Sequence, residues 1–115
     1  MVRKNHTYPV KENQNMRGGD GVVTVESLLT PQELYQKGRL FARITLQPGC
    51  SIGSHLHEGE MESFYVAKGR AEFDDNGVPV AIEAGDTTLT PSGQRHSVRN
   101  TGSEPVELIA LILFA

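Results

Sequence analysis

The sequence predicts an all-β domain, built as a small sandwich or barrel of seven or eight strands. Three observations lead to this class. Short apolar stretches recur along the chain with glycine and proline clusters between them, and Asn76-Gly77 is a strong signal for a hairpin turn. The length of 115 residues suits a single domain, because domains most often have about 100 to 150 residues.

The elements follow in order along the chain. The β-branched run of residues 22–25 is the first expected strand. A short helix is expected over residues 31–37, because Thr30 can cap it, a proline suits its first position and Glu33 completes a capping box. Gly38 would end that helix in the left-handed conformation. Further strands are expected over residues 39–46, 62–68, 70–73, 78–83, 87–90, 96–100 and 106–114.

The last of these strands is apolar at nearly every position from Leu108 to Phe114. A strand of this kind is covered on both faces. It is either a central strand of the core or part of a subunit interface, and the pattern leaves both open. A barrel this small often buries one sheet against a partner, so a homodimer is expected.

Charge and composition exclude several classes of function. The formal net charge is -3, so the chain has no basic surface for nucleic acid. The longest apolar run, residues 108–115, is far short of the roughly 20 residues that span a membrane. The single cysteine, Cys50, cannot form an intramolecular disulfide, which favours a cytoplasmic location.

The stretch HLHEGEME, residues 55–62, concentrates groups that bind metals. His55 and His57 are one residue apart, so on a strand both imidazoles would project to one face. Glu60 and Glu62 share that parity if no bulge interrupts the strand. The histidine pair alone also fits a solvated acidic turn, but His96 on an expected strand offers a third nitrogen ligand.

Two spaced motifs extend this pattern over residues 49–100. The segment GCSIGSHLHEGEMESFYVAKG carries Gly49, His55, His57, Glu62 and Gly69, and the segment GDTTLTPSGQRHSVRN carries Gly85, Pro91, Gly93, His96 and Asn100. Both match the two motifs of the cupin superfamily without a gap. The chain therefore resembles a cupin, specifically the small single-domain bacterial cupins of the conserved barrel type. The spacing to Gly69 selects Glu62 over Glu60 as the motif carboxylate.

This resemblance implies a jelly-roll barrel, also called a double-stranded β-helix. It implies one divalent metal ion inside the barrel, held by His55, His57, Glu62 and His96. Such proteins are commonly homodimers. Residues 1–26 would then form an N-terminal arm and first strand, exchanged or packed in the dimer, and residues 27–115 the single barrel.

Three neutral imidazoles and one carboxylate would leave the ion a net charge of about +1 and, in octahedral geometry, two open positions. This ligand set favours manganese, iron, cobalt or nickel, whereas zinc usually takes four ligands. The two open positions suit a bidentate anion such as oxalate or a 2-oxo acid, so the expected partner is a small anionic molecule.

Candidate substrate contacts are Arg43, Phe64 and Gln94. Arg43 could pair with an anionic ligand, or it could lie on the outer face of strand 39–46. Phe64 shares the parity of the motif glutamate and would line the pocket beneath the metal or belong to the barrel core. Gln94 flanks the third histidine in a loop, at the rim. Glu60 is either a carboxylate at the mouth or an exposed ion-pairing residue.

These observations lead to two functions and a third alternative. The first is a metal-dependent enzyme of decarboxylase, dioxygenase or isomerase type that acts on oxalate or a 2-oxo acid. The second is a non-catalytic binding or sensing module, favoured by the short loop between the motifs and the lack of an obvious lid. The third is a metal that only stiffens the barrel.

Overall fold

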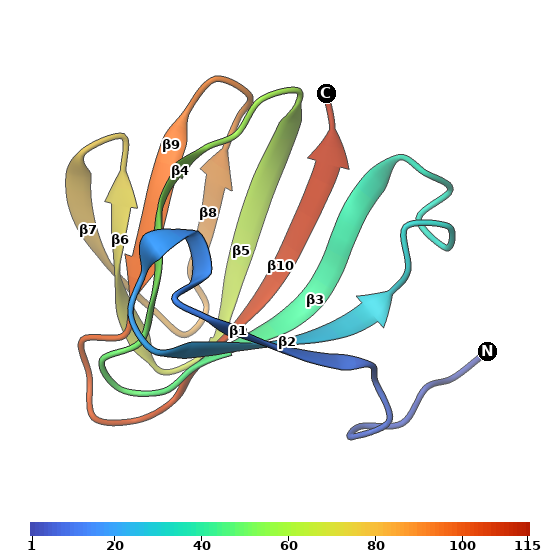
Figure 1. The fold of residues 1–115 in the computed structure, drawn as a ribbon, viewed down its shortest axis with the longest axis horizontal. Helices are drawn as coiled ribbons and strands as arrows, with labels where there is room; N and C mark the ends of the chain where they lie inside the picture. Colours follow the sequence, from blue (N-terminus) through green and yellow to red (C-terminus); the bar gives the residue numbers. More distant parts are fainter.

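The protein is a barrel of two antiparallel sheets that face each other, in a computed structural model that describes residues 1–115 (Figure 1). One sheet has the strand order β1-β2-β3-β10-β5-β8 and the other β4-β9-β6-β7. The strands are β1 (Val10–Gln14), β2 (Val22–Leu29), β3 (Gly38–Leu46), β4 (Ser51–Leu56), β5 (Glu60–Lys68), β6 (Arg70–Asp75), β7 (Val78–Glu83), β8 (Thr87–Thr90), β9 (Arg95–Arg99) and β10 (Val106–Phe114). The all-β jelly-roll prediction is confirmed.

Every expected strand is present, and two strands were not expected. β1 pairs with β2 as a hairpin, from Val10 opposite Glu26 to Gln14 opposite Val22. β4 occupies residues that carry too few apolar side chains to show a strand pattern. The predicted hairpin turn at Asn76-Gly77 joins β6 to β7, with φ of 51° and 91° as a type I′ turn requires.

The predicted helix over residues 31–37 is wrong. Its capping box does form, because the Thr30 amide donates to the Glu33 carboxylate (3.0 Å) and the Glu33 amide donates to the Thr30 hydroxyl (3.1 Å). Tyr35 and Gln36 then take left-handed φ values of 53° and 54°, which ends the chain's helical path after one turn. A segment this short cannot offset the cost of nucleating a helix. The structure contains instead a single 3-10 turn, η1 (Met16–Gly18).

β10 is the central strand of the larger sheet, between β3 and β5, so the core-strand interpretation is confirmed. The side chains that point into the barrel are buried: Leu108, Ala110 and Ile112. Those that point outward are partly exposed: Ile109, Leu111 and Leu113. Within one chain only the inner face is fully covered. Gly38 begins β3 instead of ending a helix. The position requires glycine, because a Cβ there would lie 2.3 Å from the carbonyl oxygen of Ile112.

The space between the sheets is filled by 13 buried apolar residues. Phe64 and Phe73 lie at its centre with their rings edge to face, 6.2 Å between centroids. Four buried polar side chains adjoin this core where β4 and β8 end and β5 and β9 begin: His57, Glu62, Thr90 and His96. The polar cluster therefore lies at one open end of an otherwise apolar barrel.

Candidate metal centre

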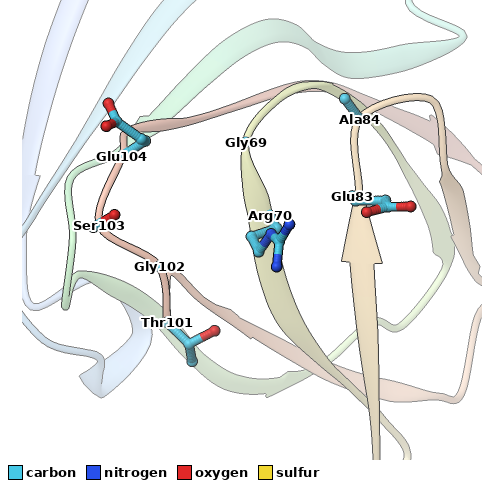
Figure 2. Close-up of a pocket in the computed structure, with 8 residues that line it drawn as sticks. All are labelled: Gly69, Arg70, Glu83, Ala84, Thr101, Gly102, Ser103 and Glu104. Carbon is cyan, nitrogen blue, oxygen red and sulfur yellow. The ribbon is translucent and has the colours of Figure 1, made fainter.

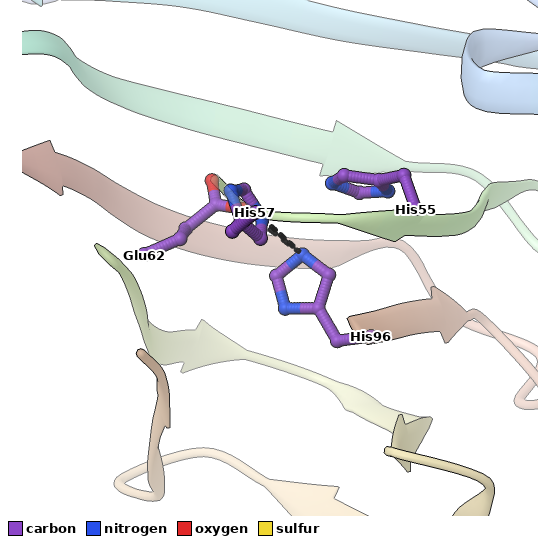
Figure 3. Close-up of side chains that lie close together, drawn as sticks. All are labelled: His55, His57, Glu62 and His96. Atoms are coloured by element: carbon purple, nitrogen blue, oxygen red, sulfur yellow. Dashed lines mark hydrogen bonds and ion pairs between the residues drawn. The ribbon is translucent and has the colours of Figure 1, made fainter. Parts of the chain in front are cut away.

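Four side chains that could hold a metal ion meet at this end of the barrel (Figure 3). One ligand atom from each of His55, His57, Glu62 and His96 lies within 4.8 Å of all the others. His55 on β4 is directly opposite His96 on β9, which places both on one sheet. Glu62 comes from β5 on the facing sheet.

The condition under which Glu62 would share the strand parity of His55 and His57, an uninterrupted strand, is not met. β4 ends at Leu56 and β5 begins at Glu60, so the chain crosses between the sheets in the three residues between them. His57 lies just beyond β4, where its amide donates to the carbonyl oxygen of Gln94 (3.0 Å). The cluster therefore forms by convergence of two sheets.

Each imidazole is held through its Nδ1 atom, which leaves Nε2 facing the centre of the cluster. The Nδ1 partners are the Gly53 carbonyl oxygen for His55 (2.8 Å), Glu60 Oε1 for His57 (3.1 Å) and Thr90 Oγ1 for His96 (2.8 Å). A carbonyl and a carboxylate only accept hydrogen bonds, so the protons of neutral His55 and His57 lie on Nδ1. Metal-binding histidines are oriented in this way in proteins.

His57 Nε2 and Glu62 Oε1 therefore face each other as hydrogen-bond acceptors, which repel one another, whereas the proton of a neutral His96 can lie on either ring nitrogen, because the Thr90 hydroxyl both donates and accepts. Glu62 Oε1 lies 3.1 Å from His57 Nε2 and 3.0 Å from His96 Nε2, and these two nitrogens are 3.1 Å apart. A cation between them would turn this repulsion into attraction. The donor set of three imidazoles and one carboxylate thus suits a divalent metal.

The cluster is largely buried, which disfavours the charged form of His55. His57 and His96 are each 1% exposed and Glu62 is 5% exposed. Burial lowers the pKa of His55, and the neighbouring imidazoles and Arg17 add to this effect, while the bond to the Gly53 carbonyl opposes it. A neutral imidazole is the form that binds metals.

Glu60 orients the cluster from outside. Its two oxygens accept hydrogen bonds from Arg39 at 2.7 and 2.8 Å, and one of them also accepts from His57 Nδ1. Arg39 lowers the pKa of Glu60 to about 2, so this carboxylate stays ionised at neutral pH. Glu60 does form an ion pair, as one of the two interpretations expected. Its contact with His57 was missed, because it depends on the turn between β4 and β5.

The cluster opens into a cavity of about 170 Å³. Its walls are apolar where β3, β4 and β10 line it, and three basic side chains stand around it: Lys11, Arg17 and Arg39. Sites for drug-sized ligands typically have volumes of roughly 300 to 1,000 Å³, so this cavity is smaller than most of them. The cavity fits a molecule of a few heavy atoms.

The structure brings none of the three predicted substrate contacts to this cavity. Arg43 lies on the outer face of the sheet, where Glu26 binds its guanidinium at 2.7 and 2.9 Å. Phe64 is buried in the core and stacks on His96, with ring centroids 5.3 Å apart. Gln94 accepts a hydrogen bond from the Asn76 side chain (2.9 Å) at the β6–β7 turn.

A larger hollow of about 630 Å³ lies among the turns at the opposite end of the barrel (Figure 2). Its charged side chains are Arg70, Glu83 and Glu104, and no histidine lines it. The cluster of three histidines and Glu62 and this hollow are therefore separate features of the fold.

Comparison with known proteins identifies relatives of this chain. It matches the cupin domain family over residues 42–112. It is 45% identical over 113 residues to an oxalate-binding protein of Thermotoga maritima, covering 98% of this chain and 93% of that protein. A crystal structure of a predicted oxalate decarboxylase from Thermotoga maritima superposes with a TM-score of 0.97 at 43% identity, over 100% of both chains.

A more distant relative is the polyketide synthase CurC of Streptomyces cyaneus, 31% identical over 98 residues. That match covers 85% of this chain and 61% of the relative. None of the helical segments is long and apolar enough to cross a membrane.

Proposed function

The chain belongs to the cupin family, and on this basis we propose that it binds one divalent metal ion and, through the ion, a small carboxylate such as oxalate or a 2-oxo acid. His55, His57, Glu62 and His96 are the proposed ligands. The observation that carries the proposal is the convergence of one ligand atom from each of these four side chains, among which His57 Nε2 and Glu62 Oε1 are two acceptors 3.1 Å apart whose repulsion a cation would relieve. The similarity to an oxalate-binding protein supports the ligand class.

Ligation by three imidazoles and one carboxylate, with two further positions open, favours manganese, iron, cobalt or nickel over zinc, which usually takes four ligands. When bound, such an ion supplies a positive charge and open positions for carboxylate oxygens. The protein contributes the orientation of the imidazoles and an apolar wall that limits the size of the ligand.

Binding without turnover is favoured by the charges around the cavity. Decarboxylation of oxalate to formate requires a proton at the carbon that loses carbon dioxide. Apart from the proposed ligands, the ionisable side chains that line the cavity are basic, and the nearby Glu60 is held ionised by Arg39. This arrangement attracts an anion but offers no carboxylic acid to protonate it.

Catalysis of decarboxylase, dioxygenase or isomerase type is the second candidate. It is supported by the number of protein ligands, since four of them leave two positions of an octahedral ion open for substrate, or for substrate and dioxygen. The cavity adjoins the cluster directly, so a ligand there would reach those positions.

The experiment that tests the proposal is calorimetric titration of oxalate into metal-loaded and chelator-treated protein. We expect binding only to the metal-loaded form, and its loss in His96→Ala but not in His6→Ala, which changes an exposed histidine. Because free oxalate chelates metals, metal content is measured again after the titration. Formation of formate or carbon dioxide, followed by NMR, would establish an enzyme. Protein that never holds stoichiometric metal would refute the proposal.

We also propose that the protein is a homodimer formed through the outer face of the larger sheet. This face presents Tyr65 (48% exposed) and Leu89 (59% exposed) beside the outward side chains of β10. Residues 1–26 would pack at the edge of the interface, since Tyr8 lies against Arg43 on the same face. Leu111→Lys should then give a monomer in analytical ultracentrifugation, whereas Val80→Lys, on the smaller sheet, should remain a dimer.

A further inference from the structure

The turn η1 lies between β1 and β2 and packs against β4, the strand that carries His55 (Figure 1). Its residues Met16 and Arg17 line one side of the cavity that adjoins the histidine cluster. The Asp20 amide donates to the Ser51 hydroxyl, and the Ser51 amide donates to the Asp20 carbonyl oxygen, both at 2.9 Å. Glycines permit the close contact. A Cβ at Gly19 would lie 2.3 Å from the carbonyl oxygen of Ser51, and one at Gly53 would lie 2.1 Å from that of Arg17. The segment is therefore held in one position relative to the cavity.

The charged residue that this turn presents to the cavity is Arg17, beside the apolar Met16. Its backbone is left-handed, with φ of 55° and ψ of 30°, a conformation that costs free energy for any residue with a Cβ. The next residue, Gly18, adopts φ of 80° without that cost. A strained backbone beneath a charged side chain at a cavity is a reason to look for a function of that side chain.

Arg17 is also free to bind a ligand. Its guanidinium forms no ion pair and no side-chain hydrogen bond within the chain, and the same is true of Lys11, which lines the cavity from β1. In contrast, the third basic residue at the cavity, Arg39, is bound by Glu60 at 2.7 Å. Two uncompensated positive charges thus face the space in front of the metal cluster.

We propose that Arg17, together with Lys11, selects small dianions by binding the carboxylate oxygens that face away from the metal. The inference rests on the proposed function and names its ligand class, which is oxalate-like dicarboxylates in preference to monocarboxylates. A metal with this ligand set carries about +1, so two further positive charges favour a ligand with two negative charges. The Asn13 side chain, on the same wall, adds a neutral donor.

The test compares two ligands that chelate a metal similarly but differ in the second carboxylate. Manganese-loaded protein is titrated with oxalate and with glycolate, in the wild type, in Arg17→Ala and in the control Arg70→Ala. Arg70 also lacks an ion pair but lines the hollow at the opposite end of the barrel. We expect Arg17→Ala to weaken oxalate binding by about 10- to 100-fold and glycolate binding by less than about threefold. Manganese affinity should change by less than about twofold.

Failure of this inference and failure of the proposed function give different results. If metal-loaded wild type binds neither ligand, the proposed function is wrong and the inference fails with it. If the wild type binds oxalate but Arg17→Ala behaves like Arg70→Ala, or loses both ligands equally, only the inference is overturned.

A second variant tests the position of the turn while keeping the guanidinium. Gly19→Ala should displace η1 from β4, because of the clash with Ser51, and should weaken oxalate binding relative to glycolate as Arg17→Ala does. An unchanged preference for oxalate in this variant, with an unchanged affinity for manganese, would contradict the role assigned to the turn.

Discussion

Replacement of Glu62 by glutamine gives opposite results with and without metal, if the cluster is a metal site. The carboxylate is almost fully buried and lies 3.0 to 3.1 Å from the Nε2 atoms of His57 and His96, of which that of neutral His57 carries a lone pair. Glutamine keeps the shape of the side chain, removes its charge and supplies an amide N–H. In the metal-free protein the amide can donate to one of the nitrogens, so Glu62→Gln should be more stable than the wild type by about 0.5 to 1.5 kcal/mol.

The magnitude with metal follows from mass action. Metal at 100 times its dissociation constant stabilises the native state by about 2.7 kcal/mol. The unfolding entropy of a 115-residue domain is about 0.24 kcal/mol per kelvin, so the wild type should melt about 11 °C higher with metal. If Glu62→Gln weakens metal binding by about 100-fold, the same metal concentration adds only about 0.4 kcal/mol, or less than about 2 °C. The order of the two melting temperatures should therefore reverse.

Differential scanning calorimetry of both proteins, with chelator and with manganese, measures this reversal. Glu104→Gln serves as the control, because Glu104 is exposed and its side chain has no ion pair. A buried ion pair between Glu62 and protonated His57 is the alternative explanation of the same contacts. In that case Glu62→Gln would lower the melting temperature of the metal-free protein, because the charged imidazole would lose its partner. That result, or a metal shift equal to that of the wild type, would refute the ligand assignment.

Four other perturbations test the cluster, the cavity and the barrel core. Glu60→Ala should weaken metal affinity by about 10- to 100-fold, because His57 loses the acceptor that orients it. Competition with a fluorescent chelator measures the affinity, and an unchanged value would contradict the orienting role. Metal should be retained at neutral pH and released as the pH falls below about 6.5, because protons compete with the metal for the imidazoles. His55 should protonate at a lower pH than a free imidazole, since burial lowers its pKa. Metal content measured after gel filtration at each pH tests whether metal is lost on acidification. Arg17→Gly should raise the melting temperature by about 2 to 4 °C, because glycine tolerates the left-handed backbone, and should weaken oxalate binding, because the guanidinium is lost. A lower melting temperature would argue against strain at this residue. Asn100→Ala should cost about 3 kcal/mol in denaturant unfolding, because a buried side chain that makes three hydrogen bonds to backbone groups is removed; a cost below about 1 kcal/mol would mean that water replaces those bonds.

The parts of this structure that the sequence predicted are those that depend on local pattern. Apolar stretches between turns located most of the strands, since a strand against a core must bury alternate side chains. β1 escaped the pattern because its inward side chains, Lys11 and Asn13, face the open cavity instead of the core. The helix over residues 31–37 failed because a capping box specifies only where a helix begins, whereas Tyr35 and Gln36 ended the segment.

The site shows the same division between local and long-range information. Motif spacing selected the four residues that the structure brings together, but strand parity does not align them, because the chain changes sheets between His57 and Glu62. The cavity wall could not be predicted. Arg17 reaches the cavity through the contact of η1 with β4, which joins segments more than 30 residues apart and depends on two glycines that no periodicity distinguishes.

The proposed metal ligands and the basic side chains in front of them come from different parts of the fold. The proposed ligands come from strands of both sheets, so the metal would join the sheets at the open end of the barrel and its affinity would be tied to core packing. The charges in front of the metal come from the β1–β2 hairpin, which contacts the barrel mainly through β3 and β4. Substitutions of Lys11 and Arg17, which do not belong to the core cluster, should therefore change the preferred ligand without altering the metal or the core. Metal affinity and ligand preference should behave as independent properties. In the double variant Glu60→Ala with Arg17→Ala, the free-energy effects of the two single substitutions on oxalate binding should add within about 0.5 kcal/mol once metal is saturating.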